Sequence, residues 1–396
     1  MRLSERLESM EESATLLMAQ LARDRKAAGK DVISLSLGEP DFDTPESIKE
    51  AAWRALQDGH TKYTPVPGIP ALREAIAEKF RTENKLPYRA ENIVVSNGAK
   101  QCIANVCLSL INPGDEVILL APYWVSYVEI VRLAGGVPVE LSAGVETDYK
   151  VTAEQLADAI TDKTRLIIFS SPCNPTGSVF TEQELRAIAG VVLEDPDLMI
   201  LSDEIYEYIN FHRDYFSIGA VEGMEKRTIT VNGFSKGFAM TGWRLGYMGA
   251  PDWLAAACAK VQGQFTSGAN SFSQQAAVFA LENSKKEVGE MREVFRKRKD
   301  LVVSGLSQIP GLKVNDPMGA FYVFPEAVDL VGKSYNGRIL NSVDDFCMLL
   351  LEEKGVAVVP GAAFGAPNCF RISYAASEEE LSRALDLMGD LVNSLD

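Results

Sequence analysis

Histidine is the scarcest residue in this sequence, because only His60 and His212 occur among 396 residues. Metal sites in proteins usually draw several of their ligands from histidine and cysteine. The six cysteines form no Cys-x-x-Cys pair, so the sequence predicts no metal site. A Ser-His-Asp triad would have to use one of the two histidines. Multi-histidine metalloenzymes are thereby nearly excluded, and serine hydrolases are disfavoured.

Long apolar runs and an excess of basic residues are also missing. No stretch reaches the roughly 18 apolar residues that a membrane span needs. Acidic residues number 55 against 39 Lys and Arg, for a formal net charge of −16. Nucleic acid binding calls for the opposite sign, so we expect neither a membrane nor a nucleic-acid partner. The first residues lack the basic and apolar segments of a secretory signal, and unpaired cysteines are typical of reducing compartments, so we expect a cytoplasmic protein.

Apolar, β-branched runs alternate with helical patterns through the middle of the chain. The predicted strands are 92–96, 116–120, 137–141, 165–171, 198–202, 227–231 and 245–250, and the clearest helices between them are 99–110, 152–160 and 181–193. The last helix begins with the capping-box spacing from Thr181 to Glu184. Strands that are apolar throughout and alternate with helices favour an α/β fold, with a mostly parallel sheet covered by helices on both faces.

The two ends of the chain have a different pattern. Residues 1–44 predict an amphipathic helix, a short strand and a loop rich in proline and glycine. A long charged helix is predicted from about residue 285, followed by strands 320–324, 356–359 and 370–373, a surface loop at 333–341, and helices 343–354 and 377–394. We expect a large domain of residues 45–285 and a smaller, discontinuous α+β domain of residues 1–44 and 286–396.

Polar residues follow three predicted strands, at the edge where open parallel sheets bind ligands. Gly98 and Ala99 lead into a helix whose free N–H groups could hold a phosphate, although a tight turn without a ligand explains them equally well. Asn174 is flanked by prolines that could aim its amide, and a purely structural turn is the alternative. Asp203 ends an apolar strand and needs a positive partner, which a structural salt bridge would also supply.

Lys236 lies in the most informative segment, which runs from residue 231 to residue 247. Burial among apolar and small residues would lower its pKa and free the amine to attack a carbonyl. Arg244, eight residues later, offers a planar fork for a phosphate. A solvated and inert lysine is the ordinary alternative, and the presence of Asp203 and Asn174 argues against it.

Several motifs occur in an order that resembles the class I (fold type I) pyridoxal-phosphate aminotransferases. They are Gly38-Glu39-Pro40-Asp41-Phe42, Tyr63-Thr64-Pro65, Pro122-Tyr123-Trp124, Asn174-Pro175-Thr176-Gly177, Ser202-Asp203-Glu204-Ile205-Tyr206, Ser235-Lys236, Gly242-Trp243-Arg244-Leu245-Gly246 and Phe370-Arg371-Ile372-Ser373-Tyr374. The resemblance runs from about Ser13 to the C-terminus. It is strongest to the bacterial-type aspartate aminotransferases, some of which also act on prephenate. It implies a seven-stranded sheet in the large domain and pyridoxal 5′-phosphate as cofactor.

The resemblance also implies roles for the cofactor-binding residues. Lys236 would attach the cofactor covalently and later move a proton, Asp203 would pair with the ring N–H, and Tyr206 would hydrogen-bond the ring hydroxyl oxygen. The other implied ligands are Gly98, Ala99, Ser235 and Arg244 at the phosphate, Asn174 and Trp124 at the ring, and Tyr63 from a neighbouring subunit. The last of these implies a homodimer with shared active sites.

Substrate binding is implied in the same way. Arg371 would clamp the α-carboxylate, with help from Gly38, Trp124 and Asn174. The segment 261–277 has no Arg or Lys, so the second carboxylate would fall to Lys100 and Thr15, as in the bacterial-type branch. A solvated Lys100 at a helix start is the alternative. The sequence departs from many relatives at Glu12 and Cys173, and relatives vary with prephenate use at Glu11, but the sequence does not decide how these residues affect specificity.

We therefore expect a transaminase that moves the amino group between L-aspartate or L-glutamate and 2-oxo acids, such as 2-oxoglutarate and oxaloacetate, by a ping-pong mechanism. Prephenate as a further acceptor is left open. The alternatives are a β-eliminating lyase that uses the same cofactor and a non-catalytic regulator that binds it. We also expect a cis peptide bond at Asn174–Pro175, with Ala121–Pro122 as the second candidate.

Overall fold

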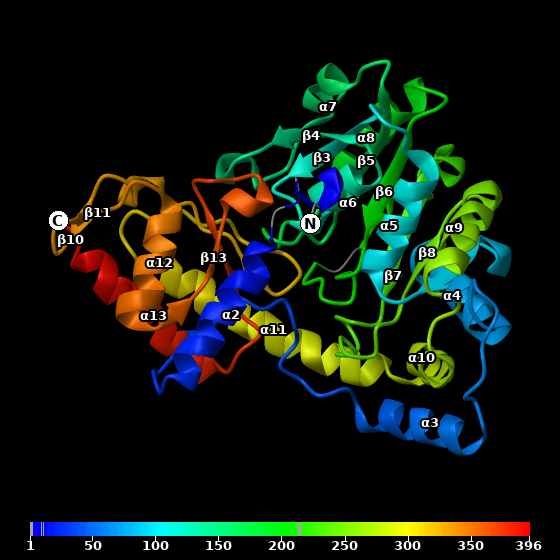
Figure 1. Cartoon of the computed structure of the whole chain (residues 1–396), viewed down its shortest axis with the longest axis horizontal. Coiled ribbons are helices and arrows are strands. Elements are labelled where there is room, and N and C mark those ends of the chain that lie inside the picture. Colours follow the sequence, from blue (N-terminus) through cyan, green and yellow to red (C-terminus); the bar gives the residue numbers. More distant parts are fainter. Residues whose placement is uncertain (1–2, 9, 11, 213–214) are drawn as a thin grey trace.

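Seven strands from the middle of the chain form one sheet (Figure 1). The computed structural model describes all residues except 1–2, 9, 11 and 213–214. In spatial order the strands are β2 (Ile93–Ser96), β8 (Gly246–Gly249), β7 (Thr228–Gly233), β6 (Met199–Asp203), β5 (Thr164–Ser170), β3 (Glu116–Ala121) and β4 (Val137–Ser142). Only β8 runs antiparallel to its neighbours. The predicted fold class is thus confirmed.

Both faces of this sheet are covered, because successive residues of its central strands are buried on opposite sides. On β3, Val117 and Leu119 belong to the apolar layer under three helices, α5 (Ala99–Leu110), α6 (Ser126–Leu133) and α9 (Asp252–Phe265). Ile118 and Leu120 belong to the opposite layer, under α7 (Ala153–Ala159) and α8 (Glu182–Glu194). Three further helices, α3 (Glu46–Gln57), α4 (Pro70–Glu83) and α10 (Ser271–Asn283), pack beyond β2 and β8.

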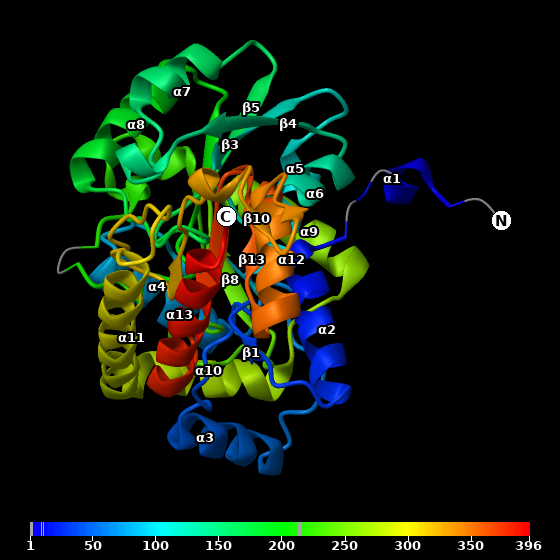
Figure 2. The ribbon, with the colours of Figure 1, turned by 90° about the vertical axis from the view of Figure 1, so that its left-hand side faces the viewer.

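The N-terminal segment packs against the C-terminal part of the chain. The N-terminal α2 (Ala14–Ala27) leads to β1 (Ile33–Ser34), which pairs in parallel with β12 (Val356–Ala357). A second sheet has the order β13 (Val359–Pro360), β14 (Phe370–Ser373) and β9 (Tyr322–Val323). Figure 2 shows these strands beside α11 (Lys285–Leu306), α12 (Val343–Lys354) and α13 (Glu378–Asn393). A short helix, α1 (Glu5–Glu8), precedes α2. No helix in the described part of the chain is long and apolar enough to cross a bilayer.

The segment predicted as a surface loop at 333–341 is instead a hairpin. The strands β10 (Ser334–Tyr335) and β11 (Arg338–Ile339) pair antiparallel. The turn residues Asn336 and Gly337 have φ angles of 50° and 81°, the left-handed values that a two-residue hairpin turn requires. The Asn-Gly pair was the sequence signal for this hairpin.

The predicted cis bond at Asn174–Pro175 is wrong. Within the described residues, the cis peptide bonds are Ala121–Pro122, the second candidate, and Ser171–Pro172, directly after β5. Because every X-Pro bond has only a small trans preference, the sequence cannot decide between two such bonds in one turn. Asn174 is held inward by another means, since its Oδ1 accepts a 2.9 Å hydrogen bond from Arg371.

Candidate active site

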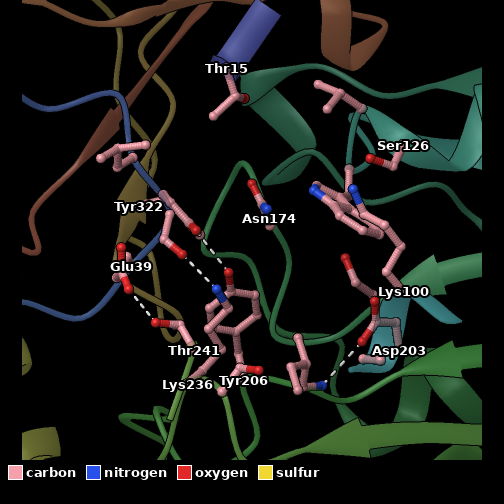
Figure 3. Close-up of a pocket in the computed structure, with 18 of the residues that line it drawn as sticks. Thr15, Glu39, Lys100, Ser126, Asn174, Asp203, Tyr206, Lys236, Thr241 and Tyr322 are labelled. Atoms are coloured by element: carbon pink, nitrogen blue, oxygen red, sulfur yellow. Dashed lines mark hydrogen bonds between the residues drawn. The ribbon is translucent and has the colours of Figure 1, made fainter. Parts of the chain in front are cut away.

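A pocket of about 430 Å³ opens at the carboxyl ends of β5, β6 and β7. The large sheet, the segment after β1 and the small sheet each contribute to its wall (Figure 3). Its lining includes most of the residues expected from the sequence, namely Thr15, Gly38, Ala99, Lys100, Trp124, Asn174, Asp203, Tyr206, Ser235, Lys236, Arg244 and Arg371. This is the edge at which a parallel sheet is expected to bind its ligand.

Lys236 projects into this pocket from the turn after β7. Its Nζ donates a 2.5 Å hydrogen bond to the carbonyl oxygen of Gly38, on the N-terminal segment. Burial lowers the pKa of Lys236 to about 8, against the opposing effect of Glu39. Glu39 accepts a hydrogen bond from Thr241, which ties the N-terminal segment to the same turn. A substantial neutral fraction makes this amine a nucleophile near neutral pH.

Asp203 is the last residue of β6 and is fully enclosed. Its carboxylate accepts a 2.7 Å hydrogen bond from the Tyr127 hydroxyl and a 3.2 Å bond from the backbone N–H of Ile205. Burial raises the pKa of Asp203 to about 6, and these two donors oppose the shift. Both donors are neutral, so the carboxylate is arranged to receive a cationic donor from a ligand.

An anion cradle lies at the N-terminus of α5. Gly98 has a φ of 86°, and a Cβ there would lie 2.5 Å from Nη2 of Arg244. A Cβ at Gly246 would collide with the backbone N of Ala99, so two glycines allow β8 and Arg244 to approach the turn. No side chain in the described part of the chain caps this helix, which leaves N–H groups of its first turn available to a phosphate.

Arg371 is fully buried on β14. Its Nη1 donates to Asn174, and its Nη2 donates a 2.6 Å bond to the carbonyl oxygen of Ser36. Its Nε has no hydrogen-bond partner among the described residues. Burial lowers the pKa of Arg371. A buried guanidinium with unused donors next to a pocket is suited to bind a carboxylate.

Lys100 and Thr15 lie on the side of the pocket away from Lys236 (Figure 3). The Nζ of Lys100 is 4.8 Å from the centre of the Trp124 ring. Burial and the nearby Arg244 lower the pKa of Lys100. The Thr15 hydroxyl is buried and has no hydrogen-bond partner in the part of the chain described. An ammonium and a free hydroxyl can each bind an acidic group on a ligand.

Two expected site residues do not line this pocket. Gly98 lies directly behind it, against Arg244. Tyr63 is 97% exposed. Glu12 is exposed, and Cys173 is buried with its thiol 3.4 Å from the carbonyl oxygen of Pro122, so neither faces the pocket. Glu11 is outside the described residues.

Sequence reasoning missed Tyr127, Tyr322 and Thr241. Tyr127 stands three residues after Trp124, and their rings pack edge to face with centroids 5.5 Å apart. The spacing of these two aromatic residues at the start of α6 was the only available signal. The other two residues lie in loops or short strands, where no periodicity marks a side chain as facing the pocket.

A buried polar cluster lies behind Asp203. Glu204 accepts hydrogen bonds from Ser217 at 2.8 Å and Ser202 at 3.1 Å. Glu207 forms an ion pair with Lys79 of α4, and Asn84 donates to Glu207 at 2.8 Å. Burial raises the pKa of Glu204 to about 8, and the negative charge of Glu207 is the second cause of this rise. The cluster fastens α4 to the segment that carries Asp203.

We expect Glu204→Gln to stabilise the protein at pH 8 but not at pH 5. A buried carboxyl with a raised pKa keeps its proton in the folded state while the unfolded chain loses its own, so stability falls as pH rises from the unfolded pKa towards about 8. The glutamine does not titrate and removes this loss, which we put at about 1–3 kcal/mol. Denaturant unfolding at both pH values measures the difference. Glu78→Gln, on the exposed side of α4, is the control, and an equal difference at both pH values would contradict the prediction.

The chain belongs to the family described as aminotransferase class I and II, whose model matches residues 30–387. It is 48% identical over 386 residues to the "Probable aspartate/prephenate aminotransferase" of Rhizobium leguminosarum bv. phaseoli, covering 96% of each chain. It is 47% identical over 385 residues to the "Aspartate/prephenate aminotransferase" of Cereibacter sphaeroides, again covering 96% of each.

Solved structures agree with this assignment. The aspartate aminotransferase from Rhizobium meliloti superposes with a TM-score of 0.97 at 43% identity, covering all of both chains. The Thermus thermophilus aspartate aminotransferase with maleate superposes with a TM-score of 0.93 at 44% identity, and the match covers 99% of this chain and 100% of that one. The chain is therefore a transaminase by family, and neither the lyase nor the regulator alternative is favoured.

Membership of this family implies pyridoxal 5′-phosphate as cofactor, and the pocket fits it. The uncapped start of α5 and Arg244 suit a phosphate. The Asp203 carboxylate, which receives only neutral hydrogen-bond donors from the described residues, suits a protonated ring nitrogen. The nucleophilic Lys236 suits an aldehyde.

Proposed function

We propose that this protein transfers the amino group between L-aspartate or L-glutamate and 2-oxo acids by a ping-pong mechanism. The observation that carries the proposal is that two cations, Arg371 and Lys100, line the same pocket as Lys236. A dicarboxylic substrate has an acidic group for each. The names of the relatives, which include aspartate and prephenate, and the maleate in the Thermus thermophilus structure support a dicarboxylic substrate.

The cofactor would be held by residues from several elements. Lys236 would bind it covalently, and Asp203 would keep a proton on its ring nitrogen. Tyr206 and Asn174 would hydrogen-bond its ring hydroxyl oxygen, and Trp124 would stack on the ring face. The phosphate would lie against Gly98, Ala99, Ser235 and Arg244.

The cofactor, when bound, supplies an electron sink for the charge left on the substrate Cα after its proton is removed. The protein has to fix the substrate and move that proton. Arg371, with Asn174, Trp124 and the Gly38 N–H, would hold the α-carboxylate so that the Cα–H bond stands perpendicular to the ring. Lys236 Nζ would move a proton between the substrate Cα and C4′ of the cofactor, acting as base at the first atom and as acid at the second.

Specificity for a second carboxylate would come from Lys100 and Thr15. A lysine is a compact charge on a flexible stem, so it can follow carboxylates at different distances from Cα. This suits aspartate and glutamate, and we propose prephenate as a further acceptor. Profiling of aspartate and glutamate as donors, and of 2-oxoglutarate, oxaloacetate and prephenate as acceptors, tests the proposal.

The active enzyme is proposed to be a homodimer with shared sites. Tyr63 is 97% exposed and does not line the pocket of its own chain, so any contact with a cofactor phosphate has to be in a partner. Exposed Phe265, Trp53 and Leu16 add apolar surface that a partner would cover.

The six cysteines are buried and free, which supports a reducing, cytoplasmic location. We propose that residues 45–285 form the large domain and that residues 1–44 and 286–396 form the small domain.

We expect Lys100→Ala and Arg371→Ala to differ in the substrates they affect. Lys100→Ala should weaken kcat/KM for aspartate and glutamate by about 1.5–3 kcal/mol, the usual worth of a charge-assisted hydrogen bond, and spare alanine and phenylalanine. Arg371→Ala should impair every amino acid, because all carry an α-carboxylate. Steady-state kinetics with both substrate classes measures the asymmetry.

Two further variants serve as controls. Lys286→Ala removes a lysine whose side chain is 85% exposed and should leave both classes unchanged. Arg371→Lys keeps a charge but loses the planar fork, and should also impair both classes. Equal losses for Lys100→Ala across the two classes would show that Lys100 serves the cofactor phosphate or the fold instead.

A further inference from the structure

Tyr322 connects the two functional sides of the pocket. It is fully buried on β9, and its hydroxyl lies 2.7 Å from the hydroxyl of Tyr206. The guanidinium carbon of Arg371 lies 4.6 Å from the centre of its ring. Figure 3 shows the Tyr322 and Tyr206 hydroxyls pointing toward each other. One side chain therefore touches both the proposed carboxylate clamp and the phenol proposed to face the cofactor.

The position of Tyr322 is fixed by its surroundings. It pairs with Ser373 on β14, the strand that carries Arg371. Any side chain at residue 38 would collide with the Tyr322 hydroxyl, so Gly38 lets the N-terminal segment close over it. The Tyr206 ring packs edge-on, with centroids 5.6 Å apart. The hydroxyl consequently has little room to turn away from Tyr206.

Either hydroxyl can be the donor in the hydrogen bond between Tyr322 and Tyr206, and the acceptors available to each proton decide which direction serves a ligand. A buried hydroxyl needs an acceptor for its proton. Tyr206 is the only hydrogen-bond partner that the described residues offer to the Tyr322 hydroxyl. Tyr206, in contrast, also faces the pocket. When Tyr322 donates to Tyr206, the Tyr206 proton is left free to be donated to a ligand.

The charge of Arg371 acts on both phenols. Burial raises the pKa of Tyr206 and of Tyr322, and the Arg371 guanidinium opposes both shifts. A carboxylate bound to Arg371 cancels part of that positive field. Both phenols then hold their protons more firmly.

We propose that Tyr322 is a positioning residue that directs the Tyr206 proton into the pocket and relays to Tyr206 whether a carboxylate occupies Arg371. The inference rests on the proposed function, because it takes Arg371 as the α-carboxylate site and Tyr206 as a cofactor ligand. In this proposal Arg371 has two roles: it binds the carboxylate, and its occupancy affects the Tyr206 hydroxyl. An amine without a carboxylate would fail to bind Arg371 and would also leave Tyr206 in its unliganded state.

Tyr322→Phe tests the proposal, because it keeps the ring under Arg371 and removes only the hydroxyl. The readout is the pKa at which the visible absorbance of the holoenzyme titrates. Losing the donor should weaken Tyr206 as a donor and raise this pKa by about 0.5–1 unit. The same substitution in a Tyr206→Phe background should have no effect. Maleate should shift the absorbance pKa less in Tyr322→Phe than in the wild type, while its affinity stays within about threefold, because the Arg371 charge is unchanged.

Tyr374→Phe is the matched control. Tyr374 is also fully buried, and its hydroxyl donates a 3.1 Å hydrogen bond to the carbonyl oxygen of Ala320, outside the pocket. It should leave the absorbance pKa unchanged. Equal effects of Tyr322→Phe in the wild-type and Tyr206→Phe backgrounds, or an unchanged response to maleate, would overturn the inference alone. A wild-type chain that takes up no visible chromophore would overturn the proposed function and the inference together.

Discussion

Lys236→Ala should abolish transamination, with a loss of at least about 10⁴-fold in kcat, since general acid–base catalysis alone contributes about 10²–10⁴-fold. The variant loses the covalent attachment point and the proton carrier at once. The Nζ is the relevant atom because burial lowers its pKa to about 8. Its only hydrogen bond among the described residues is to the Gly38 carbonyl oxygen, a contact that a ligand can replace.

Two measurements locate this function on Lys236. Borohydride reduction of the coloured wild-type protein should fix the cofactor to the peptide that contains Lys236. The reduced Lys236→Ala protein should carry no label, although it can still bind the cofactor noncovalently through Arg244 and Asp203. Lys100→Ala is the control and should be labelled like the wild type. A label on any other lysine would show that the assignment is wrong.

Asp203→Asn should bind the cofactor but lose about 10²–10³-fold in kcat, the cost of removing one preorganised electrostatic group from an active site. The Asp203 carboxylate receives hydrogen bonds only from the neutral Tyr127 and Ile205 donors, within the residues described. A protonated ring nitrogen would supply the missing cation and return the carboxylate to its charged form. Asparagine has nearly the same shape but no charge, so it cannot keep the ring nitrogen protonated.

Tyr127→Phe separates this charge effect from hydrogen bonding. It leaves the carboxylate in place and removes the 2.7 Å donor, so its loss in kcat should be much smaller. Cofactor affinity measured by fluorescence titration shows whether each variant is loaded. Near-normal turnover of a fully loaded Asp203→Asn enzyme would refute the proposed role of Asp203.

Much of the fold could be predicted because apolar patterning and turn chemistry agree in the middle of the chain. The predicted strands 116–120 and 198–202 match β3 and β6 to within one residue at each end. The capping box at Thr181 and Glu184 forms as predicted. Site residues at the ends of these strands, such as Asp203, could be predicted equally well. An acidic residue at the end of a buried strand is unusual, and the parallel topology places it at the edge of the sheet where ligands bind.

The remaining features depend on contacts between distant segments. Tyr322 faces the pocket because β9 pairs with β14, and a strand of two residues carries no periodic signal. The same limit applies to the cis bond at Ser171–Pro172, which local sequence does not distinguish from Asn174–Pro175. The Asn-Gly pair at 336–337 is the opposite case, because it is a local signal for a two-residue hairpin turn, and the prediction of a surface loop at 333–341 overlooked it.

The contact between Arg371 and the Ser36 carbonyl oxygen joins residues 335 positions apart. During synthesis on the ribosome, the segment around Ser36 emerges first and the strand with Arg371 emerges almost last. A nascent chain that already contains Lys236, Asp203 and Arg244 still has an open wall where Arg371 belongs. The last wall of the pocket therefore closes only when the chain is nearly complete, and a product truncated before β14 would carry the cofactor lysine without the means to hold an amino acid against it.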